Sequence, residues 1–266
     1  MLSSSGHARP LVVATYNVHS CIGTDNRYDP DRIAAVIREL DADIVALQEV
    51  GLRNRRGTLR EEAAYLAQAT GLEWMPGLDL ISRRGTCGNL LLTRWPVKET
   101  RWIDLSVPSR QPRGALDVDI SIGGRDLRVI ATHLGLRLGE RRRQVSQLLG
   151  AAVAAPAADG DAASVAPCIL LGDLNEWRPW GGSLRPLVDA CGPVGPALAT
   201  FPSRCPVLPL DRVFALGGPL PVDARVHRSP LATVASDHLP LRTVLAWAEE
   251  RGEAGEQAGE PASMAA

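Results

Sequence analysis

The sequence predicts an α/β (α+β) domain built in layers, and three observations lead to that prediction. Short apolar runs typical of strands recur along the 266 residues, and amphipathic helical patterns lie between some of them. Polar side chains stand at the ends of several runs. Neither of two irregular segments, residues 154–167 and 191–209, divides these polar groups into self-sufficient halves. We therefore expect one domain over residues 1–248 and a disordered acidic tail over residues 249–266.

The apolar runs are expected to form the strands of this domain. They occupy residues 11–15, 44–47, 90–93, 115–120, 127–132, 168–171, 211–215 and 239–245. Because they are spread along the whole chain with helices interspersed, strands distant in sequence must pair, which favours a single layered unit.

Helical patterns predict helices at residues 31–40, 61–70 and 138–153. The first follows a good start signal, because Asp29 is a candidate N-terminal cap and Pro30 suits the first helical position. The second ends at Gly71, which is a common helix stop. The third is charged at its start and aliphatic later.

The composition favours neither a polyanionic partner nor a secreted protein. The 29 basic and 30 acidic residues give a net charge of −1. Five scattered cysteines without Cys-x-x-Cys spacing support neither a disulfide framework nor a zinc site. No leader pattern opens the chain, and no run approaches the ~20 apolar residues of a spanning helix. We expect a cytoplasmic location and no integral membrane segment.

Five expected strand ends carry polar residues that suit a hard cation and a phosphate. They are Asn17, Glu49, His133, Asp173 with Asn175, and Asp237 with His238. In strand-rich folds such side chains leave the sheet and gather at its rim. Magnesium prefers one or two carboxylates together with water and phosphate oxygens.

Taken singly, most of these residues also have an ordinary structural explanation. Glu49 is a metal ligand or a solvated acid at a strand end. Asn17 is a donor to a phosphate oxygen and a ligand to a metal, or a turn residue. His133 by itself is more often a structural histidine than a catalytic one.

The last two sets carry a stronger signal. Asp173 can orient or deprotonate water while Asn175 holds a phosphoryl group, although Gly-Asp and Asn also form plain turns. Asp237 offers a metal-binding or charge-tuning carboxylate beside His238, an imidazole that titrates near neutrality. Asp211 is a candidate partner that orients this imidazole.

In combination, these segments resemble the endonuclease/exonuclease/phosphatase superfamily. They are the opening Asn17, Gln48-Glu49, Gly172-Asp173-Leu174-Asn175 and Ser236-Asp237-His238. This superfamily includes pancreatic-type deoxyribonucleases, abasic-site endonucleases, inositol polyphosphate 5-phosphatases and neutral sphingomyelinases. The match follows the family's order from about Leu11 to Leu241 and is highly specific. It implies a four-layer sandwich, two mixed β-sheets packed face to face with helices outside and the site at one end.

The resemblance also implies a metal site and a catalytic apparatus. Glu49 would be the main ligand of Mg²⁺, or of Mn²⁺ as a substitute, with Asn17 and Asp237 beside it. The implied catalytic residues are Asp173, Asp211, His238, His133 and Asn175, and the implied substrate-binding residues are Asn17, Asn175 and His133. Among these, Asp173 would activate water and Asp211 would orient the His238 imidazole. Arg113 is a further substrate-binding candidate, because it precedes an expected strand.

At two places the sequence departs from the family pattern, and these departures weaken the case for a second metal and for inositol phosphatase specificity. Some nucleases carry an acid where this chain has His19, which weakens any second metal site. Residues 206–213 echo the inositol phosphatase signature without its Trp and Cys. His133 matches the deoxyribonuclease, phosphatase and sphingomyelinase branches and argues against abasic-site repair.

Other residues carry weaker signals. Arg113 can clamp a phosphate bidentately or be a surface arginine, and Asn89 can reach the site. Trp177 and Trp180 follow the Gly-Asp-Leu-Asn motif and either stack on a base, a sugar or lipid, or pack in the core. The basic runs at 53–56 and 141–143 are more often solvated surfaces.

We therefore expect a metal-dependent hydrolase of phosphate esters, a phosphodiesterase or phosphatase acting on a small or lipid-linked substrate. A nuclease ranks second, because it should show a basic, salt-sensitive footprint that a net charge of −1 does not suggest. A catalytically silent binding module on the same fold should have lost site residues, and none of the matched ones is missing. A monomer is expected, and peripheral lipid contact is compatible with this interpretation.

Overall fold

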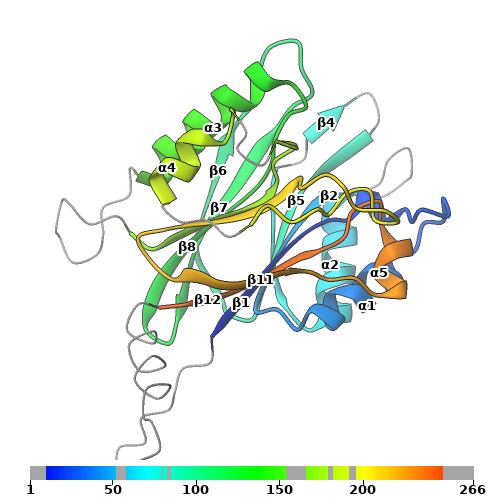
Figure 1. Ribbon diagram of the computed structural model, residues 1–266. Helices are drawn as coiled ribbons and strands as arrows, with labels where there is room; N and C mark the ends of the chain where they lie inside the picture. Colours follow the sequence, from blue (N-terminus) through cyan, green and yellow to red (C-terminus); the bar gives the residue numbers. More distant parts are fainter. Residues whose placement is uncertain are drawn as a thin grey trace, which may run out of the picture.

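The computed structural model describes residues 10–51, 58–78, 80–82, 85–153, 166–178, 182–191 and 196–247. In these residues two mixed β-sheets pack face to face, and helices cover the outer face of each sheet (Figure 1). The expected four-layer sandwich is therefore confirmed. The predicted tail at 249–266 lies outside the described residues.

The first sheet contains strands from both ends of the chain. Its strands run in the order β11 (Leu220–Val226), β12 (Leu241–Ala246), β1 (Leu11–Asn17), β2 (Ile44–Val50), β5 (Gly85–Thr93) and β3 (Glu73–Pro76), and β4 (Leu80–Ser82) pairs with β5. β1 and β2 are parallel, whereas β1 and β12 are antiparallel.

The second sheet consists of consecutive neighbours along the chain. Its strands run in the order β10 (Asp211–Leu216), β9 (Cys168–Asp173), β8 (Arg125–His133), β7 (Gly114–Ile122) and β6 (Val97–Asp104). β8 and β9 are parallel and the other neighbours are antiparallel. The C-terminal ends of β8 and β9 therefore meet at one edge of the sheet.

The helices form the two outer layers. Those on the first sheet are α1 (Pro30–Leu40), α2 (Leu59–Thr70) and α5 (Pro230–Ala235), and those on the second are α3 (Leu138–Val153) and α4 (Arg185–Cys191). A short 3₁₀ turn, η1 (His19–Cys21), follows β1. No helix of the described ranges is long and apolar enough to cross a membrane.

Local signals explain where two of the helices begin. The Asp29 side chain accepts a hydrogen bond from the Arg32 N–H at 3.0 Å, so the predicted cap of α1 is confirmed. α2 begins before the expected residue 61, because Thr58 and Glu61 form a reciprocal capping box. The described part of α3 has the predicted bounds.

Three apolar cores separate the four layers in the described residues. On β1, Val13 enters the core between the sheets, whereas Val12 and Ala14 enter the core beneath α1 and α2. On β9, Leu171 faces the middle core and Leu170 faces the core beneath α3. Burial on both faces explains why the central strands are continuous apolar runs.

The apolar pattern does not predict several of the described elements. These are β3, β4, β6, β11, α4 and α5. β6 and β11 are edge strands in which exposed residues interrupt the pattern, and α4 and α5 have only seven and six residues. β12 begins at Leu241, after the expected start at residue 239.

Candidate active site

One edge of the second sheet places three sequence-predicted residues in a row. His133 ends β8 and Asp173 ends β9, and the two are register partners. Asp211 begins β10 and is the register partner of Asp173 on its other side. Gly172 permits this close pairing, because a Cβ at that position would lie 1.9 Å from the carbonyl oxygen of Thr132.

The first sheet contributes an amide and a carboxylate to the same place. Asn17 ends β1 and pairs with Gln48 of β2. Glu49 lies where the register of β2 with β5 shifts, between Leu47 and Val50, and its φ is 58°. Such an irregularity re-aims a side chain at a sheet edge. The Oε1 atom of Glu49 accepts a hydrogen bond from Asn17 Nδ2 at 3.4 Å.

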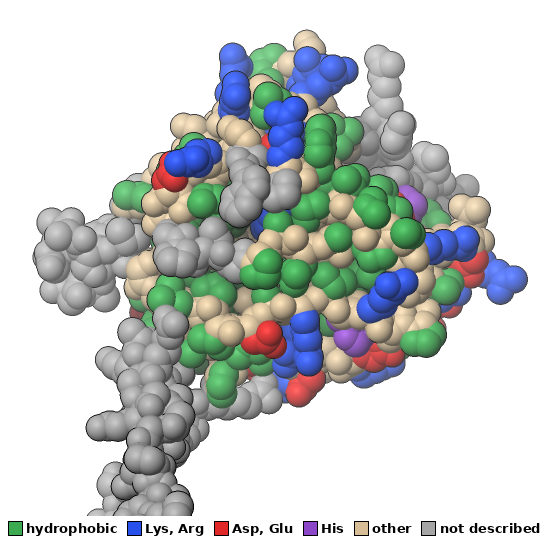
Figure 2. All heavy atoms as spheres, viewed as in Figure 1, with side chains coloured by type: hydrophobic (Ala, Val, Ile, Leu, Met, Phe, Trp, Pro, Cys, Tyr) green, Lys and Arg blue, Asp and Glu red, His purple; other side chains and the backbone are tan. Residues whose placement is uncertain are grey.

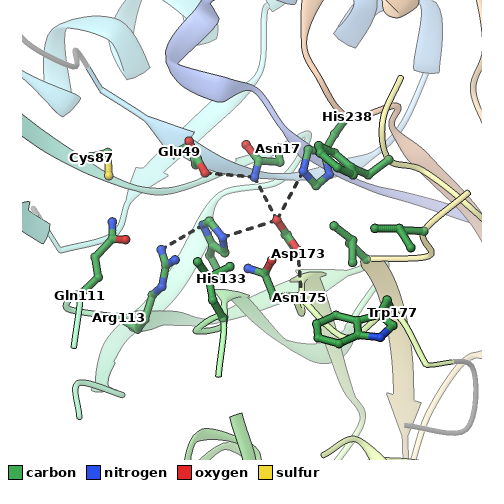
Figure 3. A pocket seen from close by; sticks show the side chains of 14 residues that line it. Asn17, Glu49, Cys87, Gln111, Arg113, His133, Asp173, Asn175, Trp177 and His238 are labelled. Atoms are coloured by element: carbon green, nitrogen blue, oxygen red, sulfur yellow. Dashed lines mark hydrogen bonds and ion pairs between the residues drawn. The ribbon is translucent and has the colours of Figure 1, made fainter. Parts of the chain in front are cut away.

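Asp173 lies at the centre of the site (Figure 3). Three nitrogen atoms face its Oδ2 atom, namely Asn17 Nδ2 at 3.0 Å, His133 Nε2 at 3.4 Å and His238 Nε2 at 3.7 Å. Its Oδ1 atom accepts a hydrogen bond from the backbone N–H of Asn175 at 3.0 Å. The side chain is 2% exposed, so these groups take the place of water around a buried carboxylate.

Asp211 contacts the imidazole of His238, which it is expected to orient. Asp211 Oδ2 lies 2.9 Å from His238 Nδ1 and accepts a second hydrogen bond from Thr200 Oγ1 at 2.5 Å. Because an ionised carboxylate only accepts hydrogen bonds, Nδ1 carries a proton and Nε2 is directed at Asp173. The Phe201 ring packs against this imidazole with centroids 4.9 Å apart.

Burial and neighbouring charges shift the pKa values of both Asp173 and His238. Burial raises the pKa of Asp173 to about 6, with Asp211 adding to the effect and His238 opposing it. Burial lowers the pKa of His238, but the carboxylates of Asp211 and Asp173 outweigh it and raise that pKa to about 10. The imidazole therefore holds its proton at neutral pH between two carboxylates.

Arg113, which directly precedes β7, adds a buried positive charge. Its Nη1 atom lies 3.3 Å from His133 Nδ1. A guanidinium has only donors, so Nδ1 accepts and His133 Nε2 carries the proton that faces Asp173. Arg113 is 5% exposed, its Nε atom has no hydrogen-bond partner, and burial lowers its pKa. Such a group is suited to bind a phosphate oxygen.

The segment Ser236-Asp237-His238 is hydrogen-bonded to the end of β1. Ser236 Oγ donates to the carbonyl oxygen of Asn17 at 2.7 Å and accepts from the His238 N–H at 3.3 Å. Asp237 is 37% exposed, with Oδ1 3.9 Å from His19 Nδ1. Asn175 donates through Nδ2 to the Leu134 carbonyl oxygen at 2.9 Å. The roles expected of Asp237 and Asn175 stay predictions.

The side chains around Asp173 enclose a cavity of about 340 Å³, which is in the range of small-molecule sites. It is lined by Asn17, Glu49, Cys87, Gln111, Arg113, His133, Leu136, Asp173, Asn175, Trp177, Phe201, Leu208, Leu210 and His238. Most of the sequence-predicted residues thus meet at one cavity. Asp211 lies behind His238, and Asp237 does not belong to this lining.

The donors at this cavity fit a hard divalent cation that is shared with a phosphate. The Glu49 carboxylate supplies oxygen atoms, which Mg²⁺ and Mn²⁺ prefer. Asn17 directs Nδ2 at Glu49 and Asp173, and its Oδ1 atom accepts a hydrogen bond from the His19 N–H at 3.1 Å. In the described ranges no group of three or more His, Cys, Asp or Glu side chains is arranged to hold a metal by itself. This set suits a cation completed by water and substrate oxygens and not a closed zinc site.

Some residues of the site region escape the sequence patterns or differ from expectation. Thr200 and the apolar lining residues other than Trp177 follow no motif. Arg141 is not on a solvated helix face, because it is 1% exposed and pairs with Glu176 at 3.3 Å. Asn89 does not line the cavity but donates to the Gly114 carbonyl oxygen at 2.9 Å. Trp180 and the basic run at 53–56 lie outside the described residues.

The described residues form a four-layer sandwich with an acid–imidazole cluster where the ends of the two sheets meet. The model of the Endonuclease/Exonuclease/phosphatase family matches residues 14–238. The chain belongs to this family, which includes phosphatases and nucleases.

Comparisons with individual proteins agree with this membership. The chain is 29% identical over 250 residues to the uncharacterized protein YbhP of Escherichia coli K12, covering 86% of this chain and 93% of YbhP. A solved endonuclease/exonuclease/phosphatase from Beutenbergia cavernae has a TM-score of 0.69 and 24% identity, covering 90% of this chain and 72% of that one. The mannosyl-6-phosphatase Bt3783 of Bacteroides thetaiotaomicron has a TM-score of 0.67 and 17% identity, covering 89% of this chain and 100% of that one.

Proposed function

We propose that the protein is a divalent-metal-dependent phosphoesterase that hydrolyses a small or lipid-linked phosphate ester by in-line attack of water. The observation that carries this proposal is the buried Asp173 carboxylate, whose Oδ2 atom faces three nitrogen donors at the wall of the cavity. A carboxylate in that setting is preorganised to position and deprotonate water.

The residues of the chain divide the work by their positions. Asp173 and the Asp211–His238 pair activate water and orient the phosphate. Arg113 and the Nε2 atom of His133 lie on the other side of Asp173 from Trp177 (Figure 3), where they can donate to phosphoryl oxygens. Each donor already has its place before the substrate binds, so little reorganisation is needed in the transition state.

Glu49 and Asn17 would hold the cation, and Asp237 is the further candidate ligand. When bound there, a divalent cation supplies Lewis-acid polarisation of a phosphoryl oxygen and stabilises the leaving group. The bulge at Glu49 and the Asn17 hydrogen bond fix the carboxylate in advance. A preformed ligand shell of this kind favours binding, because less side-chain entropy is lost.

A non-nucleic-acid substrate is favoured over DNA or RNA. On the face in Figure 2, the described basic side chains stand in separate groups among apolar and acidic ones, and the net charge is −1. Nucleic-acid binding normally relies on a continuous basic surface. The structural likeness to a mannosyl-6-phosphatase is compatible with a small phosphate ester.

A substrate panel with Mg²⁺, Mn²⁺ or chelator tests the proposal. It would compare p-nitrophenyl phosphate, bis-p-nitrophenyl phosphate, a hexose 6-phosphate, phosphatidylinositol and plasmid DNA. We expect hydrolysis of at least one non-nucleic-acid ester, abolished by chelator and lowered about 10²-fold or more in Glu49→Gln. Glu99→Gln is the matched control, because this carboxylate is 63% exposed on β6 and pairs in register with Asp119, five residues along β7 from Gly114 at the site end.

Four results would overturn parts of this proposal. Turnover in chelator, or an unaffected Glu49→Gln variant, would exclude the metal role. Nicked plasmid at low enzyme concentration, with the other esters untouched, would establish a nuclease instead. A folded protein that hydrolyses nothing in the panel would favour a silent binding module.

A further inference from the structure

Besides its polar residues, the lining of the active-site cavity includes five large apolar side chains. They are Leu136, Trp177, Phe201, Leu208 and Leu210, which we call the apolar wall. Figure 3 shows Trp177 on one side of Asp173 and Asn175, and Arg113 with Gln111 on the other. A phosphate held by the polar residues would therefore leave its substituent within reach of this wall.

Two members of the apolar wall, Leu136 and Trp177, are largely exposed to solvent and contact a buried arginine. Leu136 is 66% and Trp177 is 48% exposed. The buried Arg141 contacts both residues, because its Nη1 atom donates to the backbone carbonyl oxygen of Leu136 at 2.7 Å and its guanidinium carbon lies 5.3 Å from the Trp177 ring centroid. Arg141 is itself held by Glu176 at 3.3 Å. Rigid, exposed apolar surface gains free energy when a ligand covers it.

The inner part of the apolar wall is equally fixed. Phe201 and Leu208 form an antiparallel bridge, with the Leu208 N–H donating to the Phe201 carbonyl oxygen at 2.8 Å. The Phe201 ring packs on the His238 imidazole, which places apolar surface directly beside the proposed chemistry. Leu210 precedes Asp211, so the same segment supplies both the wall and the orienting carboxylate.

The chemistry of the apolar wall selects among substituents. Leucine and phenylalanine side chains offer no hydrogen-bond partner, so sugar hydroxyls or base edges placed against them would lose hydration without compensation. An aromatic surface alone would suit a stacked base, but Leu136, Leu208 and Leu210 present branched aliphatic surface. An alkyl or acyl chain loses no hydrogen bond there and buries its own apolar area.

We propose that the apolar wall is a binding subsite for an alkyl or acyl chain attached to the phosphate, so that the enzyme prefers amphiphilic phosphate esters. This inference rests on the proposed function only for the position of the phosphate. The chain belongs either to a membrane lipid or to a soluble alkyl ester, and these two sources share the same contacts.

Binding of n-alkylphosphonates tests the subsite independently of hydrolysis. Calorimetry with Mg²⁺ would compare butyl-, hexyl- and octylphosphonate as monomers in solution. We expect Kd to fall about two- to fourfold for each added CH₂, since each buried methylene contributes about 0.8 kcal/mol at full burial. Equal Kd values across the series, or no binding of octylphosphonate at millimolar concentration, would overturn the proposal.

Two matched variants locate the effect. Leu136→Ser should flatten the dependence of Kd on chain length, whereas Val222→Ser should retain it. Val222 is also an exposed aliphatic residue, at 49%, but lies on the edge strand β11. An unchanged slope in Leu136→Ser together with Trp177→Ala would exclude the apolar wall as the subsite.

The outcome also separates this inference from the proposed function. A chain-length dependence of Kd without hydrolysis of any panel ester would keep the subsite and remove the phosphoesterase activity. Hydrolysis with a flat Kd series would do the reverse. Comparing octyl phosphate in solution with phosphatidylinositol in phosphatidylcholine vesicles then distinguishes the two sources, since only a membrane substrate would show turnover that depends on vesicle surface.

Discussion

At the scale of single residues, the neighbours of Asp173 position its buried carboxylate and surround it with nitrogen atoms. Its Oδ2 atom faces an amide and two imidazoles, and its Oδ1 atom accepts a backbone N–H. Among these neighbours, His238 is itself contacted by a second carboxylate, because Asp211 Oδ2 lies 2.9 Å from its Nδ1 atom. Loss of this contact should therefore affect turnover more than folding.

His238→Gln should lower turnover of the best panel ester about 10²–10⁴-fold, the usual contribution of a proton-transferring group. The measurement is kcat at saturating substrate. His227→Gln is the matched control, because His227 Nε2 also contacts a carboxylate, Glu39 at 2.7 Å, on an exposed surface. Equal losses in the two variants would refute the role of the Asp211–His238 pair.

Gly172→Ala should destabilise the protein by about 2–3 kcal/mol, because its Cβ would overlap the Thr132 carbonyl oxygen at 1.9 Å and force β8 and β9 apart. Thermal unfolding measures the loss. Gly150→Ala, in α3 with nothing within 4 Å of the added Cβ, should instead stabilise by about 0.5–1 kcal/mol. A wild-type Tm for Gly172→Ala would contradict the required close pairing.

At the scale of elements, β6, β7 and β8 are joined by a buried charge cluster. Asp117 of β7 is 1% exposed and accepts hydrogen bonds from Arg128 of β8 at 2.5 and 2.8 Å and from Arg101 of β6 at 3.2 Å. Burial raises the pKa of Asp117, but the two guanidinium groups outweigh it and leave that pKa below its usual value. The cluster fastens the edge strand β6 to the sheet.

The stability that Asp117 contributes should therefore be lost in acid. It is fully present above the unfolded pKa of about 3.9 and disappears as pH falls through the lower folded value. Asp117→Asn should cost about 3–5 kcal/mol at pH 7, because it leaves buried guanidinium charge uncompensated. Urea unfolding at pH 7 and pH 3 checks both statements.

Asp126→Asn is the control for this cluster, since Asp126 pairs with Lys98 on an exposed surface. It should change stability little at either pH. A similar loss in both variants would mean that general charge, and not the buried cluster, stabilises this sheet.

The sequence predicts those strands that form continuous apolar runs, and those site residues that directly follow such runs. β1, β2, β8 and β9 are predictable because both faces are buried, and Asn17, Glu49, His133 and Asp173 because each lies at or near the end of such a strand. Asp237 and His238 do not follow a strand as expected, because the apolar run before them forms α5. Edge strands such as β6 carry no continuous apolar pattern. Apart from Trp177, which follows the Gly-Asp-Leu-Asn motif, the apolar wall is not predictable, because its leucines and Phe201 resemble ordinary core residues until the fold brings residues 136, 177 and 201–210 together.

At the scale of the whole molecule, the middle core makes the two sheets interdependent. Its members come from both sheets, such as Val13 and Leu91 from the first and Val129 and Leu171 from the second. The site lies where the edges of these sheets meet, so its geometry depends on how they pack. A substitution that leaves a cavity in this core should therefore lower the stability of both sheets together.

Leu171→Ala should lower the free energy of unfolding by about 2–5 kcal/mol and keep a single transition. Leu171 is fully buried in the middle core. Far-UV circular dichroism and tryptophan fluorescence should give coincident urea curves. Leu138→Ala, at a residue that is 36% exposed, should have a small effect, and two separate transitions in Leu171→Ala would show that the sheets unfold independently.

The pairing of β1 with β12 also determines when the candidate site can close during synthesis. Asn17 leaves the ribosome early, whereas its neighbours Ser236 and His238 leave it late. Until β12 emerges, β1 presents an unpaired edge to other nascent chains. Translation arrested before residue 236 would therefore yield a chain that has made most of its active site but cannot close it, and that exposes a strand prone to aggregation.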